Sequence, residues 1–134
     1  MYQLARSGTK LKIQSRKVHN GISRVVWKAS LVMAQYIEDV RYNEAPLKGQ
    51  EALQFLKKEH NTSEYKILEL GSGTGLGGFF SQIQLNAKEI YMTDICPQSI
   101  NLIKENIQLN KESFHHNIKS FSVNFLEWGK HDIT

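Results

Sequence analysis

The sequence of 134 residues contains one cysteine, Cys96, so no disulfide framework is expected and a reducing compartment is the default setting. It has no apolar run of the length that crosses a bilayer, so no membrane association is expected. With 40% hydrophobic and 22% charged residues, its composition is ordinary for a globular protein. These features argue against a disulfide-stapled secreted domain. They predict one structural domain in the cytoplasm, with the nucleus as the alternative.

Acidic residues are absent before Glu38, whereas seven basic residues precede it: Arg6, Lys10, Lys12, Arg16, Lys17, Arg24 and Lys28. Such a segment suits a mitochondrial transit peptide or a patch that attracts nucleic acid. The alternation over residues 10–14 instead favours a strand with one solvated face. No aromatic residues interleave with the basic ones as a stacking surface for single strands would require. Nucleic acid binding is therefore not expected.

The first part of the chain is predicted to contain short strands and two helices. Residues 10–26 are predicted to form one or two strands, with Asn20-Gly21 as a strong turn signal. Apolar residues at helical spacing predict a helix over 27–39 and a second helix over 50–59.

Strands and helices are predicted to alternate in the rest of the chain. Strands are expected at 66–70, 89–93 and 121–125, with one helix after a glycine-rich turn and another beginning at Pro97. This order predicts an α/β fold with a parallel sheet wound on both faces. Residues 1–60 would precede the sheet and residues 61–134 would form it, within one structural domain.

A glycine-rich run carries the strongest functional signal, and it reads Glu69-Leu70-Gly71-Ser72-Gly73-Thr74-Gly75-Leu76-Gly77-Gly78. Glycines after a strand let backbone N–H groups approach a ligand closely. A carboxylate at Glu69 would repel a dinucleotide pyrophosphate, but it suits a ligand with a positive amino group and a sulfonium. We therefore predict S-adenosylmethionine (SAM) as the cofactor, with Glu69 and the glycines of the turn, Gly75 among them, at its site.

The same run also contains a dinucleotide fingerprint, Gly-x-Gly-x-x-Gly, at Gly73, Gly75 and Gly78. Register argues against a dinucleotide, because the first glycine after the strand is Gly71 and Leu76 then stands at the third glycine position. A nicotinamide or flavin cofactor and a purely structural turn remain the alternatives.

Asp94 ends the second predicted strand, at about the ~20-residue offset expected of a ribose-binding acid. We predict that its carboxylate accepts hydrogen bonds from two ribose hydroxyls. The alternative is that it caps the following helix. Cys96 is expected to be a small packing residue rather than a nucleophile, and no metal site is expected.

Five segments match a known family in the right order along the chain. They are Gly-x-x-x-x-x-Trp-x-Ala-Ser-Leu over 21–31, the glycine run over 68–77, Thr93-Asp94, Asn106 with Asn110, and Leu-Glu-Trp-Gly over 126–129. With these motifs the sequence resembles the seven-strand SAM-dependent methyltransferases, which have a Rossmann-like fold. More narrowly, it resembles methyltransferase family 16, a group of protein-lysine methyltransferases.

The resemblance implies a set of cofactor contacts: Trp27 against the methionine end, Glu69 at the amino group, the backbone of Gly71, Ser72 and Gly73, Asp94 at the ribose, and Trp128 beside the adenine. It also implies methyl transfer to lysine of a non-histone protein. An acceptor in RNA or a small molecule is the alternative. No residue is predicted as a catalytic acid or base.

Family members continue beyond the third strand, whereas this sequence ends at Thr134. We therefore expect the N-terminal, cofactor-binding half of the fold: a fragment, a truncated product, or a part that a partner completes by covering the open edge of the sheet. A non-catalytic SAM-binding or interaction module is accordingly an alternative function.

Overall fold

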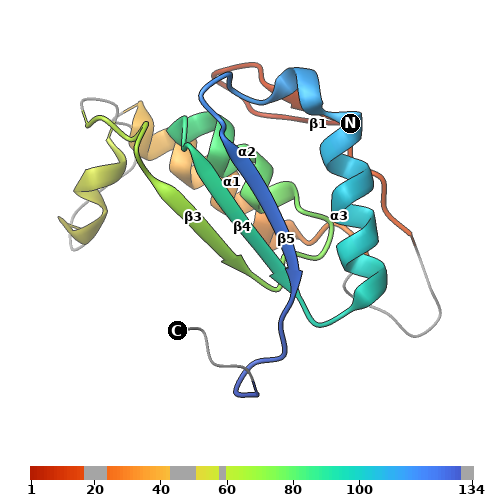
Figure 1. The fold of residues 1–134 in the computed structure, drawn as a ribbon. Helices are drawn as coiled ribbons and strands as arrows, with labels where there is room; N and C mark the ends of the chain where they lie inside the picture. Colours follow the sequence, from red (N-terminus) through yellow and green to blue (C-terminus); the bar gives the residue numbers. More distant parts are fainter. Residues whose placement is uncertain (17–23, 43–50, 58–59, 131–134) are drawn as a thin grey trace.

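The structure is a computed structural model, and it describes residues 1–16, 24–42, 51–57 and 60–130 (Figure 1). One hydrophobic core joins the N-terminal segment to the sheet, because Leu4 and Leu11 lie in the same buried cluster as Phe79, Ile90 and Met92. No helix of the described ranges has the length and apolar character needed to cross a membrane.

A parallel sheet of three strands forms the centre of the fold. Its strands are β3 (Lys66–Leu70), β4 (Glu89–Asp94) and β5 (Ser120–Phe125), in the order β3-β4-β5. Leu70 pairs with Thr93 near the carboxyl ends, and the β4–β5 ladder runs on to Asp94. The three predicted strands and their parallel arrangement are confirmed. Their carboxyl ends lie at one edge of the sheet.

Three helices, α1 (Lys28–Arg41), α2 (Leu76–Leu85) and α3 (Pro97–Leu109), pack on the same face of the sheet (Figure 1). The strand residues of that face belong to the core: Ile67, Ile90, Met92, Phe121 and Val123. The prediction of helices on both faces is wrong for the described residues. Right-handed crossovers that step in one direction across a sheet place their helices on one face, and the other face is covered where the winding reverses.

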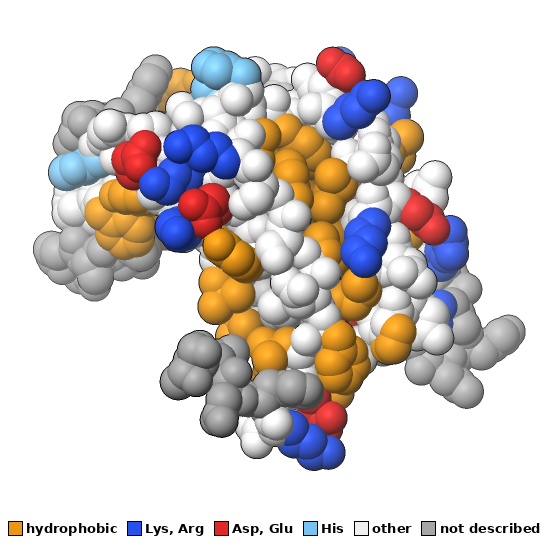
Figure 2. Space-filling model, in the orientation of Figure 1, with side chains coloured by type: hydrophobic (Ala, Val, Ile, Leu, Met, Phe, Trp, Pro, Cys, Tyr) orange, Lys and Arg blue, Asp and Glu red, His pale blue; other side chains and the backbone are white. Residues whose placement is uncertain are grey.

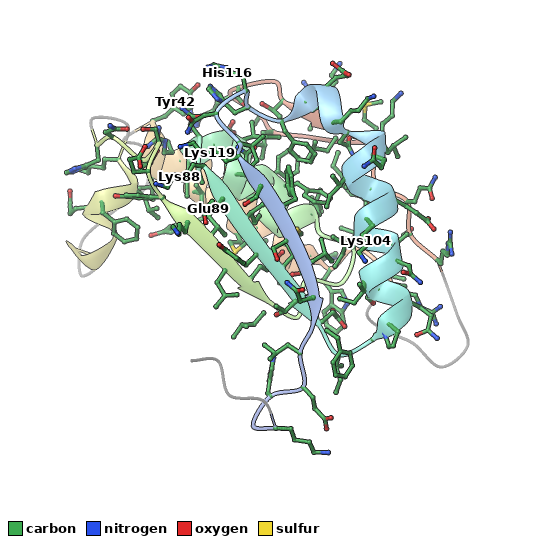
Figure 3. All side chains as sticks on the ribbon, in the orientation of Figure 1. Tyr42, Lys88, Glu89, Lys104, His116 and Lys119 are labelled. Atoms are coloured by element: carbon green, nitrogen blue, oxygen red, sulfur yellow. The ribbon has the colours of Figure 1, made fainter. Side chains whose placement is uncertain are left out.

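The other side of the sheet, called here the bare face, exposes apolar side chains. Leu68 is 59% exposed, Leu70 53% and Tyr91 36%. Figure 2 shows hydrophobic side chains on this face over the strands. Charged groups gather at the amino end of the sheet, where Figure 3 places Lys88, Glu89 and Lys119.

The N-terminal half agrees with the sequence prediction in part. A strand at residue 10 is confirmed as β2 (Lys10–Leu11), but its antiparallel partner β1 (Tyr2–Gln3) was missed. In the described residues, strand structure does not extend past Leu11 into 12–16 or 24–26. The predicted turn at Asn20-Gly21 lies outside the described residues.

The helix predicted over 27–39 is confirmed as α1, whereas the segment over 50–59 forms a 3₁₀ helix, η1 (Glu51–Leu56). The Arg41 guanidinium contacts the end of this segment. It donates to the carbonyls of Leu56 and Lys57, each at 3.2 Å. These bonds hold the end of η1 against α1. A second 3₁₀ turn, η2 (Lys111–Ser113), follows α3.

Candidate functional site

A cavity of about 660 Å³ lies at the carboxyl ends of the strands. Four segments line it: the turn after β3, the end of β4, the residues after β5, and the segment that leads into α1. Parallel α/β sheets bind their ligands at this edge. Six of the eight predicted site residues line the cavity, namely Trp27, Gly71, Ser72, Gly73, Asp94 and Trp128, whereas Glu69 and Gly75 do not.

The glycine turn, residues 71–75, holds its shape through left-handed backbone angles and a bond to β4. Gly71, Gly73 and Gly75 have φ values of 67°, 55° and 86°, a region that residues with a Cβ rarely adopt. The Gly73 N–H donates to Asp94 Oδ2 at 2.9 Å. The turn is therefore fastened to the end of the neighbouring strand before any ligand arrives.

Gly75 lies behind the cavity rather than in its wall. It immediately precedes α2, and a Cβ at this position would lie 2.6 Å from the ring of Phe79. Its N–H donates to the Ser72 carbonyl at 2.7 Å. The packing of the turn against α2 is sufficient to explain why this residue is glycine.

Asp94 is 4% exposed, and both of its carboxylate oxygens accept backbone N–H groups. Its Oδ1 accepts the Cys96 N–H at 2.9 Å, next to the start of α3, and its Oδ2 accepts the Gly73 N–H. Its side chain also lies in the cavity wall. A carboxylate has about four acceptor positions, so each oxygen keeps one for a ligand hydroxyl.

Glu69 is half-buried beneath the glycine turn, and its Oε2 is buried without a hydrogen-bond partner among the described residues. Burial raises the pKa of its carboxyl to about 7, against the lowering effect of the Ser72 hydroxyl and the Gly78 N–H; the charge of Asp94 raises the pKa further. A Cβ on Gly77 or Gly78 would lie 2.6 or 2.7 Å from its carboxylate oxygens. The side chain therefore points under the turn toward α2, not into the wall of the cavity.

Two tryptophans border the cavity and remain open to solvent. Trp27 is 52% exposed and occupies the N-cap position of α1, and Trp128 is 70% exposed. The ring of Trp128 lies 3.7 Å from where a Cβ of Gly71 would be, so it approaches the glycine turn from the segment after β5. Exposed aromatic rings at a cavity supply flat apolar surface for a ligand.

The charge of the cavity has one sign. Within the described ranges, its lining includes the carboxylates of Asp94 and Glu127 and no lysine or arginine. The N–H groups of Gly73 and Gly75 are occupied by Asp94 and by the Ser72 carbonyl, so they are not available to an anion. A pyrophosphate would find no cationic side chain here. A cationic ligand with hydroxyl groups fits the arrangement.

Sequence reasoning missed several lining residues, among them Val25, Thr74, Ile95 and Glu127. Each lies one or two positions from a predicted site residue, so adjacency is the one signal that could have found them.

A metal centre has no support in the part of the chain that the structure describes, which contains no group of three or more His, Cys, Asp or Glu side chains suited to an ion.

A family model described as lysine methyltransferase matches residues 5–133 of the chain. The match includes every segment that lines the cavity. A calmodulin-lysine N-methyltransferase of Arabidopsis thaliana is 35% identical to the chain over 69 residues. That alignment covers 52% of this chain and 22% of the relative, so the chain spans much less than two thirds of the relative's length.

Proposed function

Because the chain belongs to the lysine methyltransferase family, we propose that its cavity binds SAM and that the protein transfers the methyl group to a lysine of another protein. The carrying observation is the charge of the cavity, which offers carboxylates and no cationic side chain in the described residues. SAM carries a sulfonium and an amino group, and a dinucleotide carries a pyrophosphate. The carboxylates of the cavity lining therefore favour SAM and disfavour a dinucleotide.

The proposed roles follow from the position of each group. Asp94 keeps an acceptor position on each oxygen and would hold the two ribose hydroxyls, while its other bonds fix the glycine turn. Trp27 and Trp128 would cover opposite ends of the ligand. Glu69 would act on the ligand's amino group from beneath the turn, through water or after a change of side-chain orientation, because it does not line the cavity.

Bound SAM would supply a methyl group on an already activated sulfonium. The protein then has to align the acceptor and keep water out of the site. A lysine acceptor must arrive as the neutral amine, and burial against apolar surface favours that form. The exposed ring of Trp27, at the proposed methionine end, would provide such surface.

We further propose a non-histone protein as the acceptor, because the Arabidopsis relative is named for calmodulin. The single cysteine, Cys96, favours the reducing cytoplasm as the place of the reaction. A partner that covers the open edge of β3 would remove exposed backbone hydrogen-bonding groups.

Calorimetric titration with SAM tests the proposed site directly. We expect the wild-type protein to bind SAM, and Asp94→Ala to weaken binding by about 10- to 100-fold, the loss of one or two charge-assisted hydrogen bonds. Asp39→Ala is the matched control, because Asp39 lies on α1, pairs with Arg6 of the N-terminal segment and does not line the cavity. Unchanged affinity in Asp94→Ala, or no binding by the wild type, would contradict the proposal.

Methyl transfer is tested separately, with methyl-labelled SAM and a cell lysate, followed by mass spectrometry of the labelled residues. Label on lysine side chains supports the proposed reaction. SAM binding without any label identifies a non-catalytic SAM-binding module, and label on RNA identifies the other acceptor class.

A further inference from the structure

Asn106 of α3 is fully buried and bonded on every side of its amide. Its Oδ1 accepts the Gln14 N–H at 2.8 Å, and its Nδ2 donates to the Gln14 carbonyl at 3.2 Å. The second hydrogen of Nδ2 serves the Thr74 carbonyl at 3.0 Å. All three partners are backbone groups. The bond to Thr74 is buried and the two bonds to Gln14 are part-buried, so loss of the amide would leave backbone groups unsatisfied there.

Asn110, one turn later, makes a similar set of bonds to Lys12, two residues before Gln14. Its Oδ1 accepts the Lys12 N–H at 2.8 Å, and its Nδ2 donates to the Lys12 carbonyl at 2.6 Å and to the Asn106 carbonyl at 2.8 Å. Four helical residues rise about 6 Å and two extended residues about 6.6 Å. The two asparagines therefore match alternate residues of an extended segment, residues 10–16, which we call the arm.

The third bond of Asn106 reaches the proposed cofactor site. Thr74 stands between Gly73 and Gly75 in the glycine turn and lines the cavity. The third bond of Asn110 stays within α3 instead, because it ends on the Asn106 carbonyl. Only the first of these two side chains joins the arm to the turn.

The arm also leads to the opposite wall of the cavity. The Arg16 N–H donates to the Arg24 carbonyl at 2.8 Å. Arg24 is followed by Val25 and Trp27, which line the cavity. Asn106 thus stands between two walls: the glycine turn on one side, and the arm that is paired with the start of the α1 segment on the other.

We propose that Asn106 is a positioning residue for SAM binding, and that it couples the order of the arm to the order of the glycine turn. This inference rests on the proposed function of the cavity. A ligand that fixes the turn would fix the Thr74 carbonyl. Because the Asn106 side-chain amide bonds that carbonyl, it would also fix the N–H and carbonyl groups of Gln14. Coupling of this kind is reciprocal, so the arm and SAM stabilise each other.

A matched pair of variants separates positioning from stability. Asn106→Ala and Asn110→Ala each remove three hydrogen bonds to buried or part-buried backbone groups, so we expect both to lower the melting temperature by similar amounts. We expect Asn106→Ala to weaken SAM binding by about tenfold, the value of one hydrogen bond, and Asn110→Ala by less than about threefold. Calorimetry well below both melting temperatures measures this. Equal losses of affinity in the two variants would overturn the proposal.

The wild-type protein offers a second measurement that does not depend on the variants folding. We expect saturating SAM to slow hydrogen exchange at the Gln14 amide by about tenfold, although this group lies outside the cavity. The Ser7 amide is the control, because it donates to Glu38 on α1 and has no bond to Asn106. No slowing at Gln14 in a protein that binds SAM overturns the coupling alone. Absence of SAM binding by the wild type overturns the proposed function and this inference with it.

Discussion

Both faces of the sheet carry apolar side chains, but the two faces have different surroundings. On one face, Ile90 and Met92 of β4 are fully buried beneath the helices. On the bare face, Leu68 and Leu70 of β3 are more than half exposed. Strands buried on both faces read as continuous apolar runs, and β3 has apolar residues on both of its faces, Ile67 on one and Leu68 and Leu70 on the other. The difference teaches that the apolar residues of β3 alone do not decide which of its faces is covered. The direction in which the chain winds decides it.

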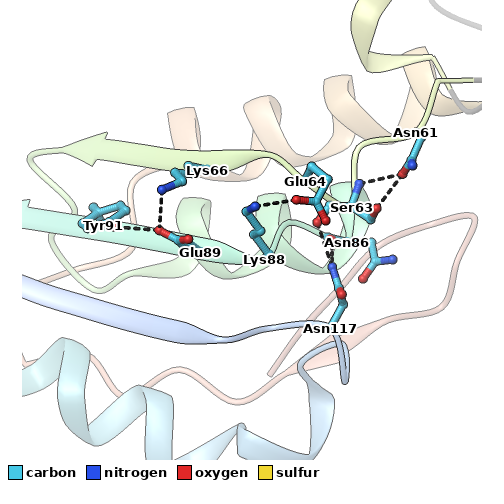
Figure 4. Close-up of polar contacts among 9 residues, drawn as sticks. All are labelled: Asn61, Ser63, Glu64, Lys66, Asn86, Lys88, Glu89, Tyr91 and Asn117. Atoms are coloured by element: carbon cyan, nitrogen blue, oxygen red, sulfur yellow. Dashed lines mark hydrogen bonds and ion pairs between the residues drawn. The ribbon is translucent and has the colours of Figure 1, made fainter.

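The bare face also carries polar side chains that are joined by an ion pair and a hydrogen bond. Lys66 Nζ lies 3.1 Å from Glu89 Oε2, which also accepts the Tyr91 hydroxyl at 2.7 Å (Figure 4). The Lys66 side chain is 59% exposed and that of Glu89 18%, so this ion pair lies near the surface, where ion pairs contribute little to stability. Substitutions on the covered face should therefore cost much more free energy than those on the bare face.

The largest effect is expected at Phe79, whose ring is fully buried under the covered face. It meets the rings of Phe114 and Phe121 at centroid distances of 5.3 and 6.4 Å in edge arrangements. We expect Phe79→Ala to lower the free energy of unfolding by about 3–5 kcal/mol, from lost burial and the cavity left behind. Urea denaturation measures this loss. A loss of unfolding free energy below about 1 kcal/mol would contradict the expectation that substitutions on the covered face cost more than those on the bare face.

An intermediate effect is expected at Glu69, the carboxyl group that the covered face buries. Its pKa is raised to about 7 in the folded protein, so the folded state keeps a proton that the unfolded state releases. The stability that this group provides is complete below its ordinary pKa of 4.5 and is lost as pH rises through about 7. We expect a fall of up to about 3 kcal/mol across that range, and no such fall in Glu69→Gln. Urea denaturation at several pH values compares the two proteins, and parallel pH profiles would contradict the expectation.

The same pair of proteins reports on the ligand. A SAM amino group near Glu69 would favour the ionised carboxylate, so SAM affinity of the wild type should rise as pH increases toward about 7. In Glu69→Gln the affinity should be weaker and nearly constant over the same range. A flat profile in the wild type would argue against any electrostatic role for this carboxylate in binding.

The smallest effect is expected at Leu68, on the bare face. Leu68→Thr keeps a side chain suited to a strand and removes apolar surface that is already 59% exposed. We expect a change in unfolding free energy within about 0.5 kcal/mol, together with reduced self-association on analytical ultracentrifugation. A loss comparable to that of Phe79→Ala would mean that the bare face is covered in solution.

Local patterns predicted the elements that are long and regular. The strands of the sheet, α1 and the start of α3 at Pro97 follow from apolar spacing and turn residues. Alternation over residues 10–14 revealed β2, whereas its partner β1 has only two residues, too few for any alternation to show. The end of η1 is bonded to Arg41, which lies fifteen residues from Leu56, and no local pattern reveals that contact.

The candidate site was predictable to the same extent. The glycine turn and Asp94 carry local signals, and the structure places both at the cavity. Asn106 and Asn110 are spaced only as helix neighbours, whereas their partners in the arm are 92 and 98 residues away. The direction of the Glu69 side chain was also beyond reach, since a sequence places a residue on a strand face but does not say what its end group meets.

The close approach of Glu69 to α2 means that substitutions at Glu69, Gly77 and Gly78 are not independent in evolution. Its carboxylate fills the volume that side chains at Gly77 and Gly78 would need. The length of the Glu69 side chain and the absence of side chains at Gly77 and Gly78 are therefore coupled. Relatives with a shorter acid before the turn gain the freedom to carry a larger residue at the head of α2, and the three positions should vary together across the family.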